Sequence, residues 1–439
     1  MNTPADPTAT GPLSRRYKGY LLIVLLALLS WNFVDRLTLG LVLQEVRADL
    51  QMTDTQLGLL TGIAFAIFYS LLGIPIARWA DRGNRVTIIA ASAAVWSLAV
   101  ALCGFAQSFG QLLAARISVG IGEAGCMPPA QSLIGDSFSR EERPRAAAIY
   151  SLGAPLSLLI GYFLGGWLNE WLGWRLTFVA ISAPSILLAL LAWRTLREPR
   201  ALALRRAVEA RPRRSRPEFL RVIGTLWRIP TFRHLVIGFS VLNFFVTGLL
   251  QWQPSFFIRS FGMHTGELGT WFAVVYGAFG VVGTWAGGHW ASGRANDEMA
   301  HLRVCSLVYL VLGTVTPLVY LSRTPYEAFA LIAVTALGYY ATFGPAIAAL
   351  QTLVPSEMRA TAFALLYLCV NLIGTGLGPL AVGALSEALR TTYGPESLRY
   401  ALLIMSPGYV WVAWETWRAS RTIRGDINAP ASASACVLR

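Results

Sequence analysis

Charged residues are scarce in this sequence of 439 residues, and their scarcity excludes most soluble folds. Asp, Glu, Lys and Arg together make up 13% of the chain, while hydrophobic residues make up 55%. A soluble globular domain carries about 25% charged residues. The composition therefore predicts a protein whose main solvent is lipid rather than water.

Histidine and cysteine are also few, which removes several classes of chemistry. The five cysteines stand apart, without the spacing of a disulfide framework or a metal site, and the four histidines are scattered near the ends of apolar runs. The chain has no Gly-x-x-x-x-Gly-Lys-Ser/Thr loop, the motif with which ATP-driven pumps hold phosphate. We expect no enzymatic activity, no metal and no bound cofactor.

In place of such sites the sequence has many long apolar runs. A helix needs about 20 residues to cross the ~30 Å hydrocarbon core with every backbone group hydrogen-bonded internally. About twelve runs are long enough, which predicts an all-α membrane protein with twelve transmembrane helices. The predicted spans are 18–43, 55–78, 86–107, 111–136, 146–168, 175–194, 233–258, 268–290, 301–321, 326–352, 361–387 and 399–418.

Arginine is distributed unevenly between the loops, and this predicts the topology. Twelve arginines lie from Arg194 to Arg233, whereas the loops on the other side carry only a few, such as Arg47 and Arg323. By the positive-inside rule, both termini and the central loop are cytoplasmic. Because topology accounts for the net charge of +13, we expect no nucleic-acid partner.

The stretch 195–231 is rich in Arg, Pro and Glu and separates two groups of six spans. Similar segments recur across it, since Arg145 opens the fifth span as Arg359 opens the eleventh, and Glu170 corresponds to Glu387. Internal repetition of this kind is typical of transporters, whose halves rock around a site near the midplane. We predict a cytoplasmic tail at 1–17, a six-helix bundle at 18–194, a cytoplasmic linker at 195–231, a second, pseudo-symmetric bundle at 232–418 and a cytoplasmic tail at 419–439.

Two motifs in the first half resemble those of the major facilitator superfamily. The loop Ala77-Arg78-Trp79-Ala80-Asp81-Arg82-Gly83-Asn84-Arg85 resembles its Gly-x-x-x-Asp-Arg-x-Gly-Arg motif, with Ala77 and Asn84 in place of the glycines. The fourth span contains Arg116-x-x-x-Gly120-x-Gly122-Glu123, similar to the fourth-helix motif of that superfamily. Gly120-x-Gly122-x-x-Gly125 also spells a dinucleotide-binding fingerprint, but no strand precedes it, so we reject that interpretation.

A narrower resemblance is to the Spinster family, whose members export lysolipids and sphingosine phosphate or are bacterial relatives of those exporters. It rests on Asp35-Arg36 in the first span, on Glu123 directly after Gly122, and on the Asp-Arg-x-Asn-Arg form of the loop. The resemblance implies the major facilitator fold and a membrane lipid or a related amphipathic molecule as the substrate.

Four ionisable residues lie well away from the ends of the predicted spans, where each costs roughly 2.5 to 3.5 kcal/mol to insert and is expected to face the bundle interior. They are Asp35, Arg36, Arg116 and Glu123. Arg116 and Glu123 are seven residues apart, so they share one helix face about 10 Å apart. Asp35 and Arg116 lie at similar depths, which allows an ion pair between them and lets one cation serve two carboxylates.

We assign Asp35 and Glu123 to proton coupling, because two carboxylates near one cation in a medium of low dielectric cannot both stay charged. Arg36, Arg116 and Asn32 are assigned to substrate binding, since a guanidinium fork suits an anionic head group. The alternative is a static ion-pair network without function.

A second cluster of charges is expected at the cytoplasmic ends of the helices. Asp81, Arg82, Arg85, Asp136 and Arg145 have the composition of a latch between spans two, four, five and eleven. The motif resemblance implies that this latch stabilises the outward-facing state. The alternative is a solvated loop.

Together these features predict a secondary active transporter, coupled to protons, that moves an amphipathic anion such as a lysophospholipid or sphingosine phosphate by alternating access. Two alternatives remain, namely a transporter of an unrelated small solute and a non-transporting receptor on the same scaffold. We expect a monomer in the inner membrane of a bacterium, with membrane lipids and the amphipathic substrate as partners and the proton as coupling ion.

The topology can be tested by proteolysis of membrane vesicles. If 195–231 is cytoplasmic, a protease added to inside-out vesicles cleaves this arginine-rich segment, and the same protease added to right-side-out vesicles leaves it intact. Cleavage only from the periplasmic side would overturn the predicted orientation.

Overall fold

The computed structural model describes residues 14–139, 141–199, 219–294, 297–355 and 358–428, and every regular element in these ranges is helical. The first half contains α1 (Arg15–Leu50), α2 (Asp54–Thr61), α3 (Ile63–Arg82), α4 (Arg85–Gly104), α5 (Phe109–Glu123), α6 (Met127–Ser137), α7 (Arg143–Ser151) and α8 (Gly153–Thr195).

The second half contains α10 (Phe219–Arg228), α11 (Pro230–Phe261), α12 (Thr265–Ser292), α13 (Glu298–Leu321), α14 (Pro325–Leu353), α15 (Arg359–Cys369), η1 (Val370–Leu377), α16 (Gly378–Tyr393), η2 (Gly394–Glu396), α17 (Ser397–Met405), η3 (Ser406–Gly408) and α18 (Tyr409–Asn428). Of these, α10 falls within the segment predicted to be the linker.

These helices make twelve passes, as predicted. Nine stretches of the described ranges are long and apolar enough to cross a membrane. Two of the nine are hairpins: α8 reverses at Gly173, which has a φ of 73°, and the stretch Thr361–Asn428 reverses at η2, where Gly394 has a φ of 54°. A positive φ favours glycine because it has no Cβ. The remaining pass is made by α5 and α6, which are separated by a turn at 124–126.

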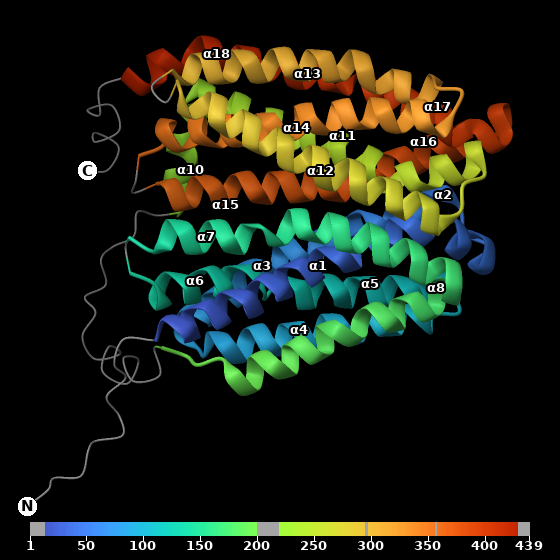
Figure 1. Ribbon diagram of the computed structural model, residues 1–439. Helices are drawn as coiled ribbons and strands as arrows, with labels where there is room; N and C mark the ends of the chain where they lie inside the picture. Colours follow the sequence, from blue (N-terminus) through green and yellow to red (C-terminus); the bar gives the residue numbers. More distant parts are fainter. Residues whose placement is uncertain (1–13, 140, 200–218, 295–296, 356–357, 429–439) are drawn as a thin grey trace, which may run out of the picture.

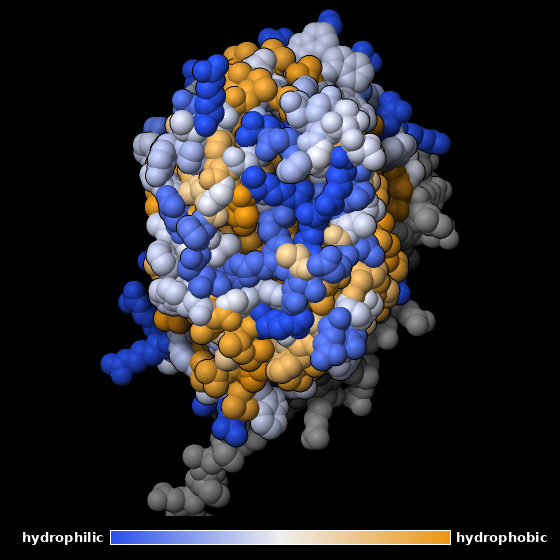
Figure 2. Space-filling view, turned by 90° about the vertical axis from the view of Figure 1, so that its right-hand side faces the viewer, coloured by the Kyte–Doolittle hydropathy of each residue, from blue (hydrophilic) through white to orange (hydrophobic). Residues whose placement is uncertain are grey.

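The passes run side by side in two groups, with the first half below and the second half above in Figure 1. The start of α1 and the end of α18 lie at one end of the bundle, which we call the terminal face, and the opposite end is the distal face. Figure 2 views the distal face and shows hydrophilic residues across its middle and hydrophobic residues around its rim.

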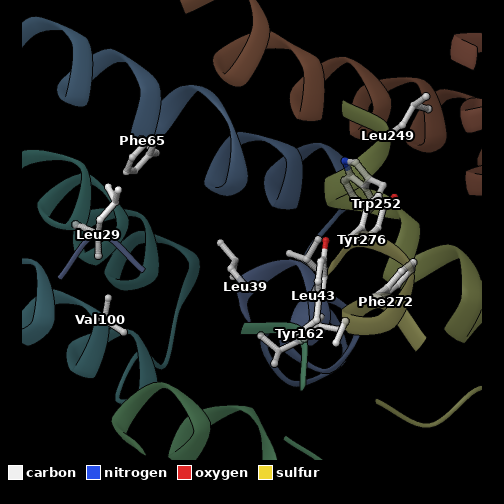
Figure 3. Packing of buried hydrophobic residues seen from close by; sticks show 14 of the residues in the cluster. Leu29, Leu39, Leu43, Phe65, Val100, Tyr162, Leu249, Trp252, Phe272 and Tyr276 are labelled. Atoms are coloured by element: carbon white, nitrogen blue, oxygen red, sulfur yellow. The ribbon is translucent and has the colours of Figure 1, made fainter. Parts of the chain in front are cut away.

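The hydrophobic core is continuous between the halves in the part of the bundle nearer the distal face. Tyr162 of α8 packs on Phe272 and Tyr276 of α12, with ring centroids 5.2 and 5.9 Å apart. Leu39 and Leu43 of α1 lie beside these rings in Figure 3. By contrast, α6 and α7 at the terminal end pack chiefly on helices of their own half. The two halves are thus closed together toward the distal face.

Glycines make this closure possible where α8 crosses α12. A Cβ on Gly166 would lie 2.4 Å from the carbonyl oxygen of Thr265, and a Cβ on Gly269 would lie 2.2 Å from that of Tyr162. Such distances are shorter than any van der Waals contact, so the two backbones approach only because both positions lack a side chain.

Replacing one of these glycines tests the crossing. Gly269→Leu should lower the melting temperature of the purified protein, because overpacking costs about 1–3 kcal/mol and here the obstacle is backbone. Gly288→Leu on the same helix is the matched control, since a Cβ there meets nothing within 4 Å. Equal melting temperatures for the two variants would show that the crossing is not close packed.

Candidate functional site

A cluster of polar side chains lies inside the first half, contributed by α1 and α5. Asp35, Arg116 and Glu123 are 0%, 2% and 1% exposed, and Asn32 is also buried. All of them were predicted from the sequence to be site residues. The structure therefore brings the predicted residues of these two helices into one interior region.

Glu123 is paired with Arg36, both through a hydrogen bond of 2.6 Å donated by Nε of the arginine and through a contact of Nη2 with the same oxygen. Nη2 of Arg36 also donates to Oδ1 of Asn32 at 3.4 Å. The side chain of Arg36 is 21% exposed, whereas that of Glu123 is fully buried. Arg36 is the member of the pair that solvent or a ligand can reach.

Three aromatic rings surround the guanidinium of Arg36. Its central carbon lies 5.1, 4.3 and 5.0 Å from the ring centroids of Phe33, Phe65 and Tyr69. Such contacts stabilise a cation that has lost part of its water. The sequence analysis missed this cage, because aromatic residues four apart on an apolar helix are common and point to no particular partner.

The position of Glu123 follows from the local sequence of α5. Pro128 and Pro129 lack backbone N–H donors, so the helix stops at Glu123 and resumes as α6 after a turn. Gly120 and Gly122 let α5 pack closely, because Cβ atoms there would lie 2.9 Å from the carbonyl oxygen of Phe65 and 2.5 Å from the backbone nitrogen of Trp96. The glycines that spell a dinucleotide fingerprint are therefore packing positions, and rejecting that interpretation was correct.

The predicted ion pair between Asp35 and Arg116 is not formed in this conformation. Both carboxyl oxygens of Asp35, and Nε and Nη1 of Arg116, are buried without a hydrogen-bond partner among the described residues. The expectation that Arg116 pairs with both carboxylates was also wrong in this conformation, since Glu123 is paired with Arg36. Nearly all buried polar groups in proteins are paired, so a carboxyl group and a guanidinium left unpaired in one region mark a candidate functional site.

A cavity lies in the other half of the molecule. It is lined mainly by aromatic and aliphatic side chains of α11, α13, α14 and α15, including Phe239, Tyr309, Tyr339, Phe343 and Tyr367. This cavity has no charged side chain among its lining residues. The polar cluster of the first half thus contains charged side chains, whereas the lining of this cavity in the second half is mainly apolar.

The element η1 beside this cavity is π-helical, and side chains of α11 bond to its backbone. Asn243 donates to the carbonyl oxygen of Val370 at 3.0 Å, and Thr247 donates to that of Gly374 at 3.0 Å. A Cβ on Gly374 would lie 2.3 Å from Nδ2 of the Asn243 side chain, so this side chain fits only because residue 374 is a glycine. π-helical turns within α-helices are frequent at functional sites.

The predicted latch at the terminal face is formed only in part. Arg85 is fully buried and bonds to Asp136 at 2.8 Å, and its backbone N–H donates to Glu198 at 2.7 Å. Arg145 is exposed and makes no ion pair with another described side chain. The side chains of Asp81 and Arg82 lie outside what the structure describes. Glu198 was missed, although it is an acidic residue at the start of a strongly basic segment.

A larger polar network closes the distal face, and it was not predicted. The buried carboxylate of Asp54 accepts two hydrogen bonds from Arg259, at 2.8 and 2.6 Å, and one from Ser386 at 2.7 Å. Arg47 lies 3.1 Å from the same carboxyl group. Arg259 also donates to Gln44 at 2.7 Å. Because Asp54 belongs to the first half and Arg259 and Ser386 to the second, the network joins the halves.

Residues 20–379 match the family model of the Major Facilitator Superfamily. The chain belongs to the major facilitator superfamily. An MFS-type efflux pump of Mycolicibacterium smegmatis is 31% identical over 406 residues, which cover 90% of this chain and 91% of the pump. Protein spinster homolog 1 of Xenopus tropicalis is 25% identical over 422 residues, or 89% of this chain and 78% of that protein.

A solved structure from the same family is also similar along its whole length. It is a bacterial homolog of the human lysosomal transporter Spinster in an inward-facing and unoccupied conformation. The two chains are 30% identical with a TM-score of 0.82, covering 95% of this chain and 100% of that one. The major facilitator fold and the resemblance to the Spinster family, both predicted from motifs, are confirmed. Members of this superfamily are membrane transporters, not enzymes.

The internal repeat of the superfamily explains a symmetry of the distal face. Glu170 of α8 accepts from the side chain of Thr265 at 3.2 Å and from the backbone N–H of Gly266 at 3.4 Å, at the start of α12. Its counterpart Glu387 of α16 accepts from the backbone N–H of Asp54 at 2.9 Å, at the start of α2. Each carboxylate thus caps a helix of the opposite half, where the helix dipole favours negative charge.

Breaking the distal network should open this face. In Asp54→Asn the amide replaces a carboxylate that neutralises two arginines, and loss of one partner of a buried ion pair costs about 3–5 kcal/mol. A loss of this size shifts the equilibrium between the closed and the open distal face by more than about 100-fold. Spin labels at Leu172→Cys and Tyr326→Cys, both exposed at the distal face in opposite halves, would report a longer distance.

Asp49→Asn is the matched control for this substitution. Its carboxyl side chain is 46% exposed and pairs with Arg175 of the same half. We expect the label distance in this variant to match the wild type. An unchanged distance in Asp54→Asn would show that the apolar contacts close the distal face without the ion pair.

Proposed function

We propose that this chain is a proton-coupled secondary transporter that moves an amphipathic anion, such as a lysophospholipid or sphingosine phosphate, by alternating access. The observation that carries the proposal is the unequal state of two buried carboxylates. Glu123 is bonded to Arg36, whereas neither oxygen of Asp35 has a hydrogen-bond partner among the described residues.

The proton is assigned to Asp35 because a buried charge without a partner is costly. An isolated carboxylate in an apolar medium costs far more to bury than its neutral form. Asp35 therefore carries a proton in this conformation and Glu123 remains ionised against Arg36. Release of the proton then requires a change in the surroundings of Asp35, such as an approach of Arg116.

The substrate class follows from the contrast between the two halves. The first half offers two arginines, of which Arg36 is reachable, to an anionic head group. The second half offers an apolar lining that includes five aromatic side chains, the kind of surface against which a hydrocarbon tail packs. A molecule with both parts is a lysophospholipid or sphingosine phosphate. Similarity to spinster homologs supports this assignment.

Orientation and direction are part of the same proposal. With the terminal face in the cytoplasm of a bacterium, as the arginine distribution predicts, closure at the distal face corresponds to the inward-facing state. The transporter acts as a monomer of two bundles, at 18–194 and 232–418, in the inner membrane. Substrate and proton then enter and leave through a cavity between the bundles.

One observation favours a second candidate function. The 31% identity to an MFS-type efflux pump covers nearly the whole of both chains, and it is higher than the 25% identity to the Xenopus spinster homolog. The second candidate is therefore efflux of an unrelated small solute through the same fold, with the same proton site. The two candidates differ only in the molecule that the cavity accepts.

Transport in proteoliposomes tests the proposal. A pH gradient should drive flux of labelled lysophosphatidylglycerol by the wild type, and Asp35→Asn and Glu123→Gln should each lose at least about tenfold of the gradient-driven flux, because neither can exchange a proton. Glu123→Gln should still bind the probe. Asp49→Asn, an exposed carboxylate, is the control and should transport normally.

The possible failures point to different conclusions. Gradient-driven flux that survives in both Asp35→Asn and Glu123→Gln would leave the ion-pair network static and remove the proton from the mechanism. Binding of the probe without flux in the wild type would indicate a receptor. Absence of binding with gradient-driven flux of another solute would favour the second candidate.

A further inference from the structure

The outer surface of α18 carries a band of tryptophans followed by a band of arginines toward the terminal face. Trp411, Trp414 and Trp417 are 51%, 49% and 42% exposed. Arg418 and Arg421 come next and are also exposed. On an α-helix this spacing puts all five side chains on the side that faces away from the bundle.

Each arginine lies over the tryptophan one turn earlier. The guanidinium carbon of Arg418 is 5.2 Å from the ring centroid of Trp414, and that of Arg421 is 4.9 Å from the ring centroid of Trp417. A cation held over an aromatic face keeps its N–H donors free at the outer edge. The two guanidinium groups are therefore oriented by the rings without being neutralised by them.

Neither arginine has a carboxylate partner among the described residues. The nearby acidic side chains are engaged elsewhere: Glu415 is bonded to His234 at 2.7 Å, Asp426 to Thr231 at 2.6 Å, and Asp297 to Arg424 at 3.3 Å. The positive charge of Arg418 and Arg421 is consequently available to a ligand from outside the chain.

The neighbouring helix α13 adds a third cation and an apolar surface. Ser306 donates to the carbonyl oxygen of Ala413 at 2.6 Å, and Arg424 bonds to Asp297, so the two helices run antiparallel in a fixed register. Arg303 lies between these two contacts along α13 and is exposed. Leu307, one turn farther from the terminal face, is 60% exposed. In Figure 1 α13 and α18 form the outer edge of the second half.

From this arrangement we infer that the outer surface of α13 and α18 binds an anionic glycerophospholipid of the leaflet at the terminal face. The phosphate is held by Arg418 and Arg421, with Arg303 at the same level. The tryptophans lie at the depth of the glycerol region, where indole rings concentrate in membrane proteins, and the acyl chains run along the apolar side chains beyond them. This lipid is a resident of the protein surface and is separate from any transported molecule.

Lipid-dependent thermal stability tests the site. The purified protein in non-ionic detergent is titrated with dioleoyl-phosphatidylglycerol or dioleoyl-phosphatidylcholine, and the midpoint of thermal unfolding gives the apparent affinity by mass action. We expect stabilisation by phosphatidylglycerol and little by phosphatidylcholine. In R418Q/R421Q the phosphatidylglycerol titration should shift to about tenfold higher lipid or more.

The matched control removes the same charge from the same face of the membrane. R15Q/R16Q changes two exposed arginines at the start of α1 and should shift the titration by less than about twofold. Equal losses in the two double variants would mean that the lipid responds only to net charge, and an unshifted titration in R418Q/R421Q would exclude the site. If R418Q/R421Q does not fold, R418Q and R421Q are compared singly, each with an expected loss of about threefold.

The tryptophan contacts provide a second test with the charge unchanged. R418K/R421K keeps both cations but not the planar guanidinium groups that lie on the rings. We expect its affinity for phosphatidylglycerol to lie between that of the wild type and that of R418Q/R421Q. Wild-type affinity in the lysine variant would show that the stacked geometry plays no part and would overturn the proposed mode of binding.

Discussion

A charged side chain inside a membrane protein needs a partner of opposite charge, and this constraint acts on the interior of this transporter. The bond between Arg36 and Glu123 pairs one of the two buried carboxyl groups, and Asp35 and Arg116 remain unpaired in the same region. Charge is therefore offset only in part in this conformation, and an approach of Arg116 to Asp35 would complete the pairing. The aromatic rings around Arg36 stabilise its guanidinium where it has lost part of its water.

The sequence was sufficient for the twelve passes, because apolar length is a local property and each span could be counted without knowing its neighbours. It was also sufficient to select Asp35, Arg36, Arg116 and Glu123 as interior charges. It could not decide which arginine meets which carboxylate. That choice depends on how α1 and α5 are rotated about their axes, and the rotation is set by Gly120, Gly122 and the end of α5 at Glu123.

The distal network shows the same limit from another direction. Asp54 and Arg259 lie at helix ends, where charged residues indicate topology. The sequence does not show that these two ends, more than 200 residues apart, meet in the fold. The repeat did contain a clue, since Glu170 and Glu387 were recognised as counterparts. Only the fold shows that each caps a helix of the opposite half, so the symmetry of the sequence becomes a symmetry of the closed face.

The π-helical segment η1 has a consequence for how the chain can evolve. A π-helical turn contains one residue more than the α-helix it interrupts, so deletion of one residue within Val370–Leu377 would let α15 and α16 join as a regular helix. Because the wider turn already absorbs that extra residue, the residues on either side would approximately keep their faces, and Glu387 would still reach Asp54. The deletion would instead remove the wide turn whose carbonyl oxygens accept hydrogen bonds from Asn243 and Thr247. A change of length in η1 therefore acts beside the apolar cavity and leaves the distal face in place, whereas a deletion from a regular helix would rotate everything after it by about 100°.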